Sequence, residues 1–186
     1  MSANRNTAAD RLPGDPDKTT LIEQIIRVDQ AGEYGAKRIY EGQLAVLGKT
    51  DAGPALRAML KTEEGHLADF NRIMAERGVR PTVLQPFWHV AGFALGAATA
   101  LLGKEAAMAC TVAVEDVIGE HYAEQAAALG DDEAALRDTV SAYRRDELAH
   151  REEALAAGAE QAPGYPLLSE GIKAATRLAI WLSKRI

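Results

Sequence analysis

The sequence is poor in cysteine and in positive charge, and each shortage excludes a class of protein. Cys110 is the single cysteine among 186 residues, which excludes a disulfide framework and a cysteine-based zinc site and suits a reducing compartment. Lys and Arg number 21 against 27 Asp and Glu, so the formal net charge is −6. A nucleic-acid partner requires clustered positive charge, so we expect none. The length, with 47% hydrophobic residues, is that of one globular domain with its own core.

A membrane-spanning apolar run is also missing. Residues 81–103 carry no charged side chain, but Pro81 and Pro86 interrupt the start of this stretch, and its continuous apolar part covers only residues 90–102. A spanning helix needs about 20 apolar residues. The stretch is therefore expected to form a buried or interfacial helix.

The N-terminal residues 1–18 are polar and include Pro13, Gly14 and Pro16. They lack the apolar core of a signal peptide, and the acids among them are atypical of a transit peptide. We expect a disordered tail here and a single domain over residues 19–186. The missing transit peptide favours a bacterial protein, although a eukaryotic form trimmed of its presequence would look the same.

The rest of the chain has helical periodicity and no convincing strand. A capping box, Thr20-x-x-Glu23, predicts where the first helix begins, and Gly48 and Gly78 are natural stops for the first two helices. The expected helices run from Thr20 to 47, from Pro54 to 77, from Glu105 to Leu129, from an Asp131 or Asp132 cap to Gly158, and from Pro166 to Ile186.

The turns between these helices predict the topology. Tight turns near 48–53 and 130–132 form two helical hairpins, and one long connection begins at Gly78. This is the pattern of an all-α, ferritin-like four-helix bundle with one long crossover. The uncharged stretch would supply an apolar crossover helix, and the last helix, with apolar and basic residues on different faces, would be a C-terminal amphipathic helix.

Two of the four histidines close an E-x-x-H triplet, Glu63 to His66 and Glu147 to His150. Residues three apart lie on one face of a helix, so each triplet can direct a carboxylate and an imidazole at one point. Taken singly, such triplets also occur on ordinary solvated helix faces.

The spacing of two further glutamates favours a metal site. Glu33 lies 30 residues before Glu63 and Glu115 lies 32 before Glu147, while the two halves are offset by 82 to 84 residues. The sequence thus contains two copies of one half-site, the ligand set of di-iron and di-manganese carboxylate proteins. Two divalent ions would neutralise the four carboxylates, and oxygen-rich ligands favour iron or manganese over zinc or copper.

Several other residues have two readings each. Asp29, one turn before Glu33, would either hold a ligand histidine or lie at the surface. One of His121 and Tyr122 would line the site, or Tyr122 would be a core tyrosine. His89 is expected in an interface or core, and Cys110 in inert packing.

Longer stretches resemble the demethoxyubiquinone hydroxylases of ubiquinone biosynthesis. The resemblance covers the chain from about Thr19 onward and is carried by RVDQAGEYGAKRIYEGQLAVL, EEGHLADF, CTVAVEDVIGEHY, RRDELAH and KAATRLAIWLSKRI. It implies that six residues are iron ligands, with no departure at any of them: Glu33, Glu63, His66, Glu115, Glu147 and His150. It also implies a site role for the pair His121 and Tyr122, in electron or proton delivery.

The resemblance further implies a di-iron monooxygenase with two Fe ions per chain, O2 as co-substrate and an external reductant, for which NADH is a candidate. Its substrate would be a polyprenyl quinol, hydroxylated from demethoxyubiquinol to demethylubiquinol. The enzyme would sit peripherally on the cytoplasmic face of a bacterial inner membrane, or on the matrix side of the mitochondrial inner membrane. A lipid-binding accessory protein and a homo-oligomer are candidate partners.

Two elements would serve a lipid substrate. We expect the uncharged stretch and the last helix, which carries Lys173, Arg177, Lys184 and Arg185 beside apolar residues such as Leu178, to dock on the membrane. Gly32 and Gly35 beside Glu33 would allow either close helix packing or room for substrate. Other readings of a di-metal bundle stay open: a peroxidase or manganese catalase, a tRNA hydroxylase, or non-enzymatic iron storage.

Overall fold

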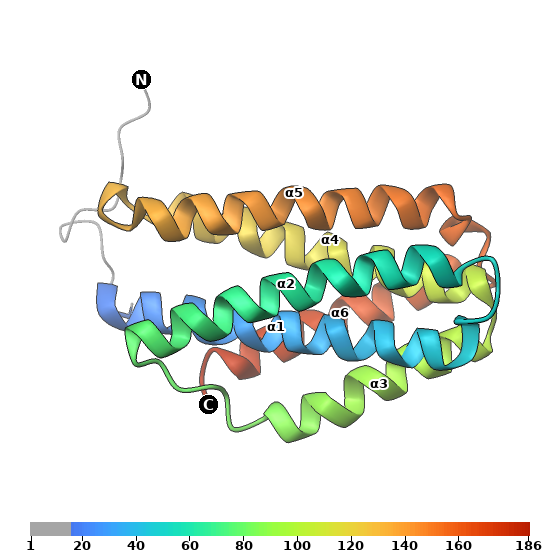
Figure 1. Cartoon of the computed structure of the whole chain (residues 1–186), viewed down its shortest axis with the longest axis horizontal. Helices are drawn as coiled ribbons and strands as arrows, with labels where there is room; N and C mark the ends of the chain where they lie inside the picture. Colours follow the sequence, from blue (N-terminus) through green and yellow to red (C-terminus); the bar gives the residue numbers. More distant parts are fainter. Residues whose placement is uncertain (1–15) are drawn as a thin grey trace.

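A computed structural model describes residues 16–186, and all regular structure in this part is helical (Figure 1). In chain order the elements are α1 (Lys18–Leu47), α2 (Gly53–Arg77), α3 (Gln85–Leu101), α4 (Lys104–Ala128), the 3-10 turn η2 (Asp131–Glu133), α5 (Ala134–Ala156), the 3-10 turn η3 (Ala159–Gln161) and α6 (Tyr165–Ser183). Residues 1–15 of the predicted tail lie outside the described part.

The four long helices form the predicted bundle. α1 pairs with α2 and α4 pairs with α5, so each hairpin of the sequence is a hairpin in space. α3 is the crossover and packs mainly along α1, while α6 packs on α4. The all-α, ferritin-like architecture is therefore confirmed.

The first helix begins earlier than its capping-box motif predicts. α1 starts at Lys18, and its N-cap is Asp17, whose side chain accepts a hydrogen bond of 2.8 Å from the backbone N–H of Thr20. The prediction of Thr20 as cap is wrong because the Asp17 carboxylate binds the Thr20 amide and starts the helix about one turn earlier, which places Thr20 inside the first turn.

The fourth bundle helix also begins differently from the prediction. Asp131 and Asp132 lie in a 3-10 turn, and α5 starts only at Ala134. Asp131 forms an ion pair of 2.9 Å with Arg137, and Asp132 pairs with Lys18 of α1. Their carboxylates are therefore used in ion pairs instead of capping a helix.

Small residues let the crossover helix approach α1 closely. A Cβ atom on Gly96 of α3 would collide with the carbonyl oxygen of Ile39, and one on Gly42 of α1 would collide with that of Phe93. Only glycine fits at such positions. α3 nevertheless keeps large apolar side chains exposed, including Phe87 and Val90. Within residues 16–186, no helix has both the length and the apolar character needed to cross a membrane.

Candidate metal centre

The six residues predicted as metal ligands meet in the middle of the bundle. Each of the four bundle helices contributes: Glu33 from α1, Glu63 and His66 from α2, Glu115 from α4, and Glu147 and His150 from α5. All six side chains are buried, and the four glutamates are at most 2% exposed. The reading of these acids as solvated helix-face residues is therefore wrong.

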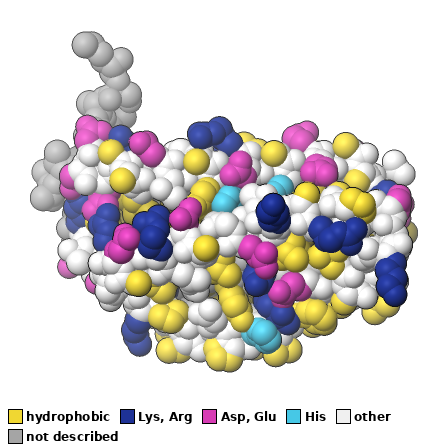
Figure 2. Space-filling model, in the orientation of Figure 1, with side chains coloured by type: hydrophobic (Ala, Val, Ile, Leu, Met, Phe, Trp, Pro, Cys, Tyr) yellow, Lys and Arg dark blue, Asp and Glu magenta, His cyan; other side chains and the backbone are white. Residues whose placement is uncertain are grey.

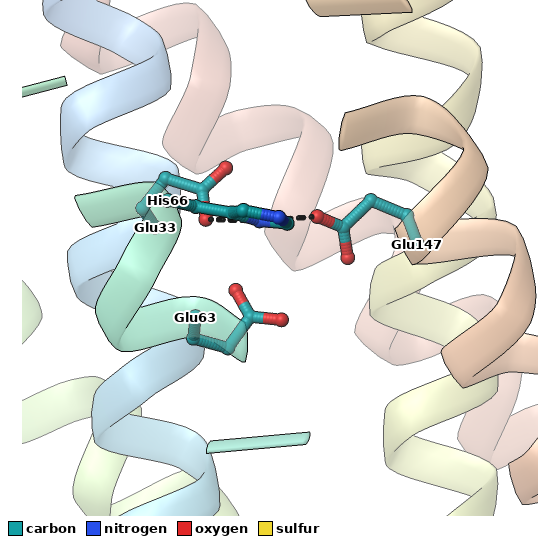
Figure 3. Close-up of side chains that lie close together, drawn as sticks. All are labelled: Glu33, Glu63, His66 and Glu147. Atoms are coloured by element: carbon teal, nitrogen blue, oxygen red, sulfur yellow. Dashed lines mark ion pairs between the residues drawn. The ribbon is translucent and has the colours of Figure 1, made fainter. Parts of the chain in front are cut away.

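The six residues form two overlapping groups. Ligand atoms of Glu33, Glu63, His66 and Glu147 all lie within 4.8 Å of one another, and so do those of Glu63, Glu115, Glu147 and His150. Figure 3 shows the first group, in which His66 lies between Glu33 and Glu147 and Glu63 points its carboxylate towards the same space. Glu63 and Glu147 are shared, whereas each group has its own histidine and one unshared glutamate.

Both histidines direct the same ring nitrogen into the centre. The Nδ1 atom of His66 lies 3.3 Å from Glu33 and 3.4 Å from Glu147. The Nδ1 atom of His150 lies 3.1 Å from Glu63 and 3.6 Å from Glu147. Each Nδ1 thus stands at the right place to bind an ion together with three carboxylates.

Unpaired ligand atoms test whether these residues fit a metal. Among the described residues, seven buried atoms of the centre have no hydrogen-bond partner: Glu33 Oε2, Glu63 Oε1, His66 Nδ1, Glu115 Oε2, Glu147 Oε1 and Oε2, and His150 Nδ1. Buried polar atoms are normally hydrogen-bonded. Atoms left unpaired together in one place are accounted for by cations bound between them, so the donor set fits two divalent ions.

The electrostatics of the centre also demand positive charge. Burial first, and then the charge of Glu147, raise the pKa of Glu63 and of Glu115 well above the ordinary range. Burial lowers the pKa of His66, but the adjacent carboxylates of Glu147 and Glu33 outweigh it and bring that pKa to about 10. The centre therefore takes up protons, which divalent cations would replace.

Two tyrosines hold the unshared glutamates. The hydroxyl of Tyr122 donates to Oε1 of Glu33, and the hydroxyl of Tyr40 donates to Oε1 of Glu115 over 2.7 Å. Tyr122 thus contacts a predicted ligand and also belongs to a buried apolar cluster, so the structure agrees with both readings of this residue. Tyr40 was not predicted, although a signal exists: each tyrosine follows the glutamate of its own helix by seven residues, and the two tyrosines are 82 apart.

A carboxylate partner for a ligand histidine was expected at Asp29, but the residue found in this role is Asp146. Nε2 of His66 lies 3.1 Å from Asp146 Oδ2, and the ring of Tyr143 stacks on this histidine at 3.8 Å. Asp29 is buried and bonded to Gln125, so neither reading of Asp29 is correct. Asp146 could have been noticed because it directly precedes Glu147 in the D-E-x-x-H run.

The remaining candidates lie outside both ligand groups. His121 is 8% exposed, and its Nε2 atom lies 2.8 Å from the amide nitrogen of Gln125. The hydroxyl oxygen of Tyr34 lies 2.6 Å from Nδ1 of His89 on α3, so the two side chains share a hydrogen bond. Cys110 is fully buried, and burial raises the pKa of its thiol to about 12, consistent with inert packing.

An apolar cavity of about 170 Å³ lies between α1, α3, α4 and α6. Its wall includes Gly32 and Ala36, which flank Glu33, and Val114 and Ile118, which flank Glu115. Gly35 also lines it, and a Cβ atom on Gly32 or Gly35 would meet nothing within 4 Å. These two glycines therefore leave room in the cavity and do not serve close helix packing.

Comparison with known proteins agrees with the resemblance seen in the sequence. The family model described as "Ubiquinone biosynthesis protein COQ7" matches residues 20–183. The chain is 58% identical over 186 residues to the 3-demethoxyubiquinol 3-hydroxylase of Rhodospirillum rubrum, covering 100% of this chain and 88% of that protein.

Two eukaryotic relatives match over most of their length. Identity is 53% over 168 residues to the NADPH-dependent 3-demethoxyubiquinone 3-hydroxylase, mitochondrial, of Rattus norvegicus, covering 88% of this chain and 77% of the relative. Identity is 39% over 186 residues to the 5-demethoxyubiquinone hydroxylase, mitochondrial, of Saccharomyces cerevisiae, covering 91% of this chain and 80% of the relative. With a bundle, a buried carboxylate–histidine centre and this coverage, the chain belongs to the family of the ubiquinone biosynthesis protein COQ7.

Proposed function

We propose that the protein is a di-iron monooxygenase that uses O2 to hydroxylate the ring of a polyprenylated demethoxyquinol, converting demethoxyubiquinol to demethylubiquinol in ubiquinone biosynthesis. One observation carries this proposal: two buried ligand groups share Glu63 and Glu147, and an apolar cavity is lined by residues that lie next to Glu33 and Glu115 in the chain. The names of the relatives, all hydroxylases of demethoxyubiquinol or demethoxyubiquinone, favour this substrate over peroxide, tRNA or stored iron.

The six ligands would hold two iron ions, one in each group. A set of carboxylate oxygens with one imidazole per ion suits iron. When bound, the iron pair supplies the O2 activation and redox chemistry that side chains cannot perform. The reaction also needs two electrons from an external reductant, and because one relative is named NADPH-dependent, we include NADPH beside NADH as its source.

The chain's own residues orient the ligands and handle protons. Tyr122 and Tyr40 each donate to Oε1 of an unshared glutamate, which leaves Oε2 without a hydrogen bond and available to a bound ion. Asp146 lies 3.1 Å from Nε2 of His66, where it can accept that N–H and would fix the ring with Nδ1 towards a metal ion that has displaced the second proton. We assign Tyr122, with the adjacent His121, to the delivery of protons or electrons on the Glu33 side of the centre.

The cavity would take the quinol. Its wall residues flank Glu33 on α1 and Glu115 on α4, so a ring bound there lies against the backbone segments that carry both unshared ligands. The other walls are α3 and α6, which are apolar along this side, with Trp88 donating to Ser183 over 3.1 Å where the two helices meet. An isoprenoid tail would leave the site between α3 and α6.

The exposed apolar residues of these same two helices support peripheral membrane binding. Phe87 and Val90 on α3 are 60% and 65% exposed, and Trp181 on α6 is 51% exposed. In Figure 2 hydrophobic side chains gather along the lower edge of the face in view, where α3 lies. The face would rest on the membrane from the cytoplasmic side in a bacterium, or from the matrix side in a mitochondrion.

Two of the four basic residues predicted to dock, Lys173 and Arg177, contribute less than the sequence suggested. Lys173 lies 2.7 Å from Asp116 and Arg177 lies 3.5 Å from Glu120, so both are paired with acids of α4. We therefore expect apolar burial to dominate vesicle binding, with weak dependence on anionic lipid. Absence of binding to vesicles of any anionic content would contradict the membrane proposal.

The function is tested by loading the purified chain anaerobically with ferrous ion and measuring turnover. We expect two iron ions per chain and, with a demethoxyquinol, a reductant and isotopically labelled O2, a product that carries one labelled oxygen atom. The control is Glu115→Ala, which should retain the fold and lose turnover. A mineral load of many irons per chain, or loaded protein that leaves the quinol unchanged, would overturn the proposal.

A further inference from the structure

The wall of the apolar cavity carries few polar side chains. Trp88 on α3 and Thr176 and Ser183 on α6 have an N–H or O–H group, and every other residue described in this wall is aliphatic or glycine. A ligand that brings oxygen atoms into the cavity therefore has at most three side-chain donors to bind.

Two of these three donors are already used within the protein. The Thr176 hydroxyl donates to the carbonyl oxygen of Ile172 in its own helix, over 3.0 Å. The indole N–H of Trp88 donates to Oγ of Ser183 over 3.1 Å.

The hydroxyl of Ser183 is the third donor, and it is free. Ser183 accepts the bond from Trp88, but its own proton has no acceptor among the described residues. The side chain is only 3% exposed, so bulk solvent does not supply one. A hydroxyl can donate one hydrogen bond while it accepts another. Ser183 therefore retains one donor for a ligand in the cavity.

Two hydrogen bonds hold this part of the wall in place. Besides the bond from Trp88 to Ser183, the hydroxyl of Thr82, which precedes α3, donates to a backbone oxygen of Ile186, which follows α6, over 2.6 Å. The start of α3 is thus joined to the end of α6 on both sides of Ser183 in the chain. The free donor belongs to a fixed corner of the cavity, which we call the Trp88–Ser183 corner.

The size of the cavity suits a single six-membered ring. Its volume is about 170 Å³. An apolar cavity of about 150 Å³ holds one benzene ring. Ala and Gly from α1, α3 and α6 make up much of the wall, and they leave this space open. A substituted ring therefore fills the cavity, and an oxygen on its edge comes within reach of the wall.

The Trp88–Ser183 corner is built by helices that carry no metal ligand. It comes from α3 and α6, whereas Glu33 and Glu115 are carried by α1 and α4, which supply other parts of the same wall. A ring held by one edge at this corner can present its opposite edge to the segments that adjoin these two glutamates. In a demethoxyquinol the carbon to be hydroxylated lies across the ring from the carbon that bears the tail, and a ring oxygen lies next to the tail.

We propose that Ser183, oriented by Trp88, donates a hydrogen bond to the ring oxygen next to the isoprenoid tail and so determines which edge of the ring faces α1 and α4. This inference rests on the proposed quinol substrate. The tail would leave between α3 and α6, at the corner that binds this oxygen. Ser183 is in this sense a specificity residue, because it distinguishes a ring that carries an oxygen at this edge from one that does not.

Binding of a quinone to the oxidised, iron-loaded protein tests this without turnover. Ser183→Ala removes the donor, and Ser169→Ala is the control, since Ser169 is a buried serine of α6 outside the cavity wall. Both are made in Trp181→Phe protein, where Trp88 is the one remaining tryptophan. A demethoxyquinone with one isoprene unit should quench the fluorescence of Trp88. We expect its Kd to rise about five- to tenfold in Ser183→Ala and to stay unchanged in Ser169→Ala.

A ligand without oxygen separates the hydrogen bond from the shape of the cavity. Tetramethylbenzene resembles the ring but accepts no such bond, so its affinity, measured by competition with the quinone, should be the same in the parent protein and in Ser183→Ala. In the infrared spectrum of the bound quinone, one of the two carbonyl bands should lie at lower frequency in the parent protein, and this shift should disappear in Ser183→Ala.

Three results would overturn the inference. They are a quinone that does not quench Trp88, a quinone affinity that Ser183→Ala leaves unchanged, and an equal loss of affinity for the quinone and for tetramethylbenzene. Binding that depends on Ser183 in a protein that never hydroxylates the quinol would support the inference and contradict the proposed function. Hydroxylation by a protein whose quinone binding is indifferent to Ser183 would do the reverse.

Discussion

Tyr40 on α1 donates a hydrogen bond to Glu115 on α4, with 2.7 Å between the two oxygens, and so joins the two halves of the bundle at the metal centre. Tyr122 on α4 donates to Glu33 on α1 in the opposite direction. In both glutamates the bonded atom is Oε1, and Oε2 is a buried atom without a hydrogen bond in the described structure. The two bonds therefore determine which oxygen of each unshared glutamate would be available to a metal ion.

Removing the first of these bonds should destabilise the protein. In Tyr40→Phe the buried Glu115 carboxylate loses its only hydrogen-bond donor among the described residues. We expect the free energy of unfolding of the metal-loaded protein to fall by about 1–3 kcal/mol, measured by urea denaturation. The control is Tyr34→Phe, whose hydroxyl bonds to His89 in an exposed position. Equal losses in the two variants would show that the effect is not specific to the centre.

Shared and unshared ligands should differ in their effect on metal stoichiometry. Because Glu63 belongs to both ligand groups and Glu115 to one, Glu63→Gln should abolish stoichiometric binding of both ions. Glu115→Gln should leave about one ion per chain, in the group of His66. Anaerobic equilibrium dialysis against ferrous ion measures both numbers. The same stoichiometry in the two variants would contradict the arrangement of two groups with bridging carboxylates.

Asp146 should act on one ion only. It accepts from Nε2 of His66, and loss of such a partner typically weakens metal affinity about 10–100-fold. In a stepwise ferrous titration, Asp146→Ala should weaken one binding step and leave the other unchanged, since His150 belongs to the other group. Asp138→Ala, an exposed acid two turns earlier on α5, is the control. If both steps weaken equally, Asp146 has a general structural role.

Removing the metal should reverse the usual dependence of stability on pH. In the metal-free chain the pKa values of Glu33, Glu63 and Glu115 are raised by burial, so the folded state binds more protons than the unfolded state above about pH 4. The contribution of His66, with a folded pKa of about 10, is complete below about pH 6.5 and is lost as pH rises. Stability of the metal-free protein should therefore fall between about pH 6 and pH 9.

Thermal unfolding across this range checks the sign of the effect. The metal-loaded protein should show no such fall, because binding to deprotonated ligands strengthens as pH rises. The metal-free Glu63→Gln variant should lose stability less steeply, since one of the titrating carboxylates is gone. A metal-free wild type that becomes more stable between these pH values would contradict the description of the centre as proton-loaded.

The sequence predicted the bundle and four of the ligand candidates from local spacing, and the repeat between the two halves of the chain added Glu33 and Glu115. Glycines and prolines mark the turns, and helical periodicity places each glutamate three residues before its histidine on one face. Tyr40 and Asp146 were missed for a physical reason: each acts on a residue of another helix, 75 and 80 positions away. Such contacts depend on the register between helices, and the sequence of a single helix does not encode that register.

The helix starts illustrate the same limit at shorter range. Thr20 fits a capping box, yet Asp17 caps α1 because its carboxylate binds the backbone amide of Thr20, which puts Thr20 inside the helix. Asp132 fits an N-cap, yet it pairs with Lys18, more than a hundred residues earlier. In each case two residues of suitable chemistry compete, and the neighbouring structure selects between them.

The cavity should respond to a side chain added at Gly35. This glycine lines the cavity and has open space where its Cβ would lie, so Gly35→Leu should fill the volume without moving α1. We expect two bound iron ions as in the wild type, a raised KM and a slower turnover of a long-tailed demethoxyquinol. Stability should not fall, since replacing glycine in a helix is favourable by up to about 1 kcal/mol.

Gly65→Leu is the matched control for that substitution. Gly65 lies in α2, is exposed and also has nothing within 4 Å of its Cβ position, so its replacement has the same helix-forming effect away from the cavity. It should leave iron content and turnover unchanged. The result that would contradict a substrate role for the cavity is an equal loss of iron and of turnover in Gly35→Leu. In that case the added side chain would be disturbing the helix that carries Glu33 and not the space beside it.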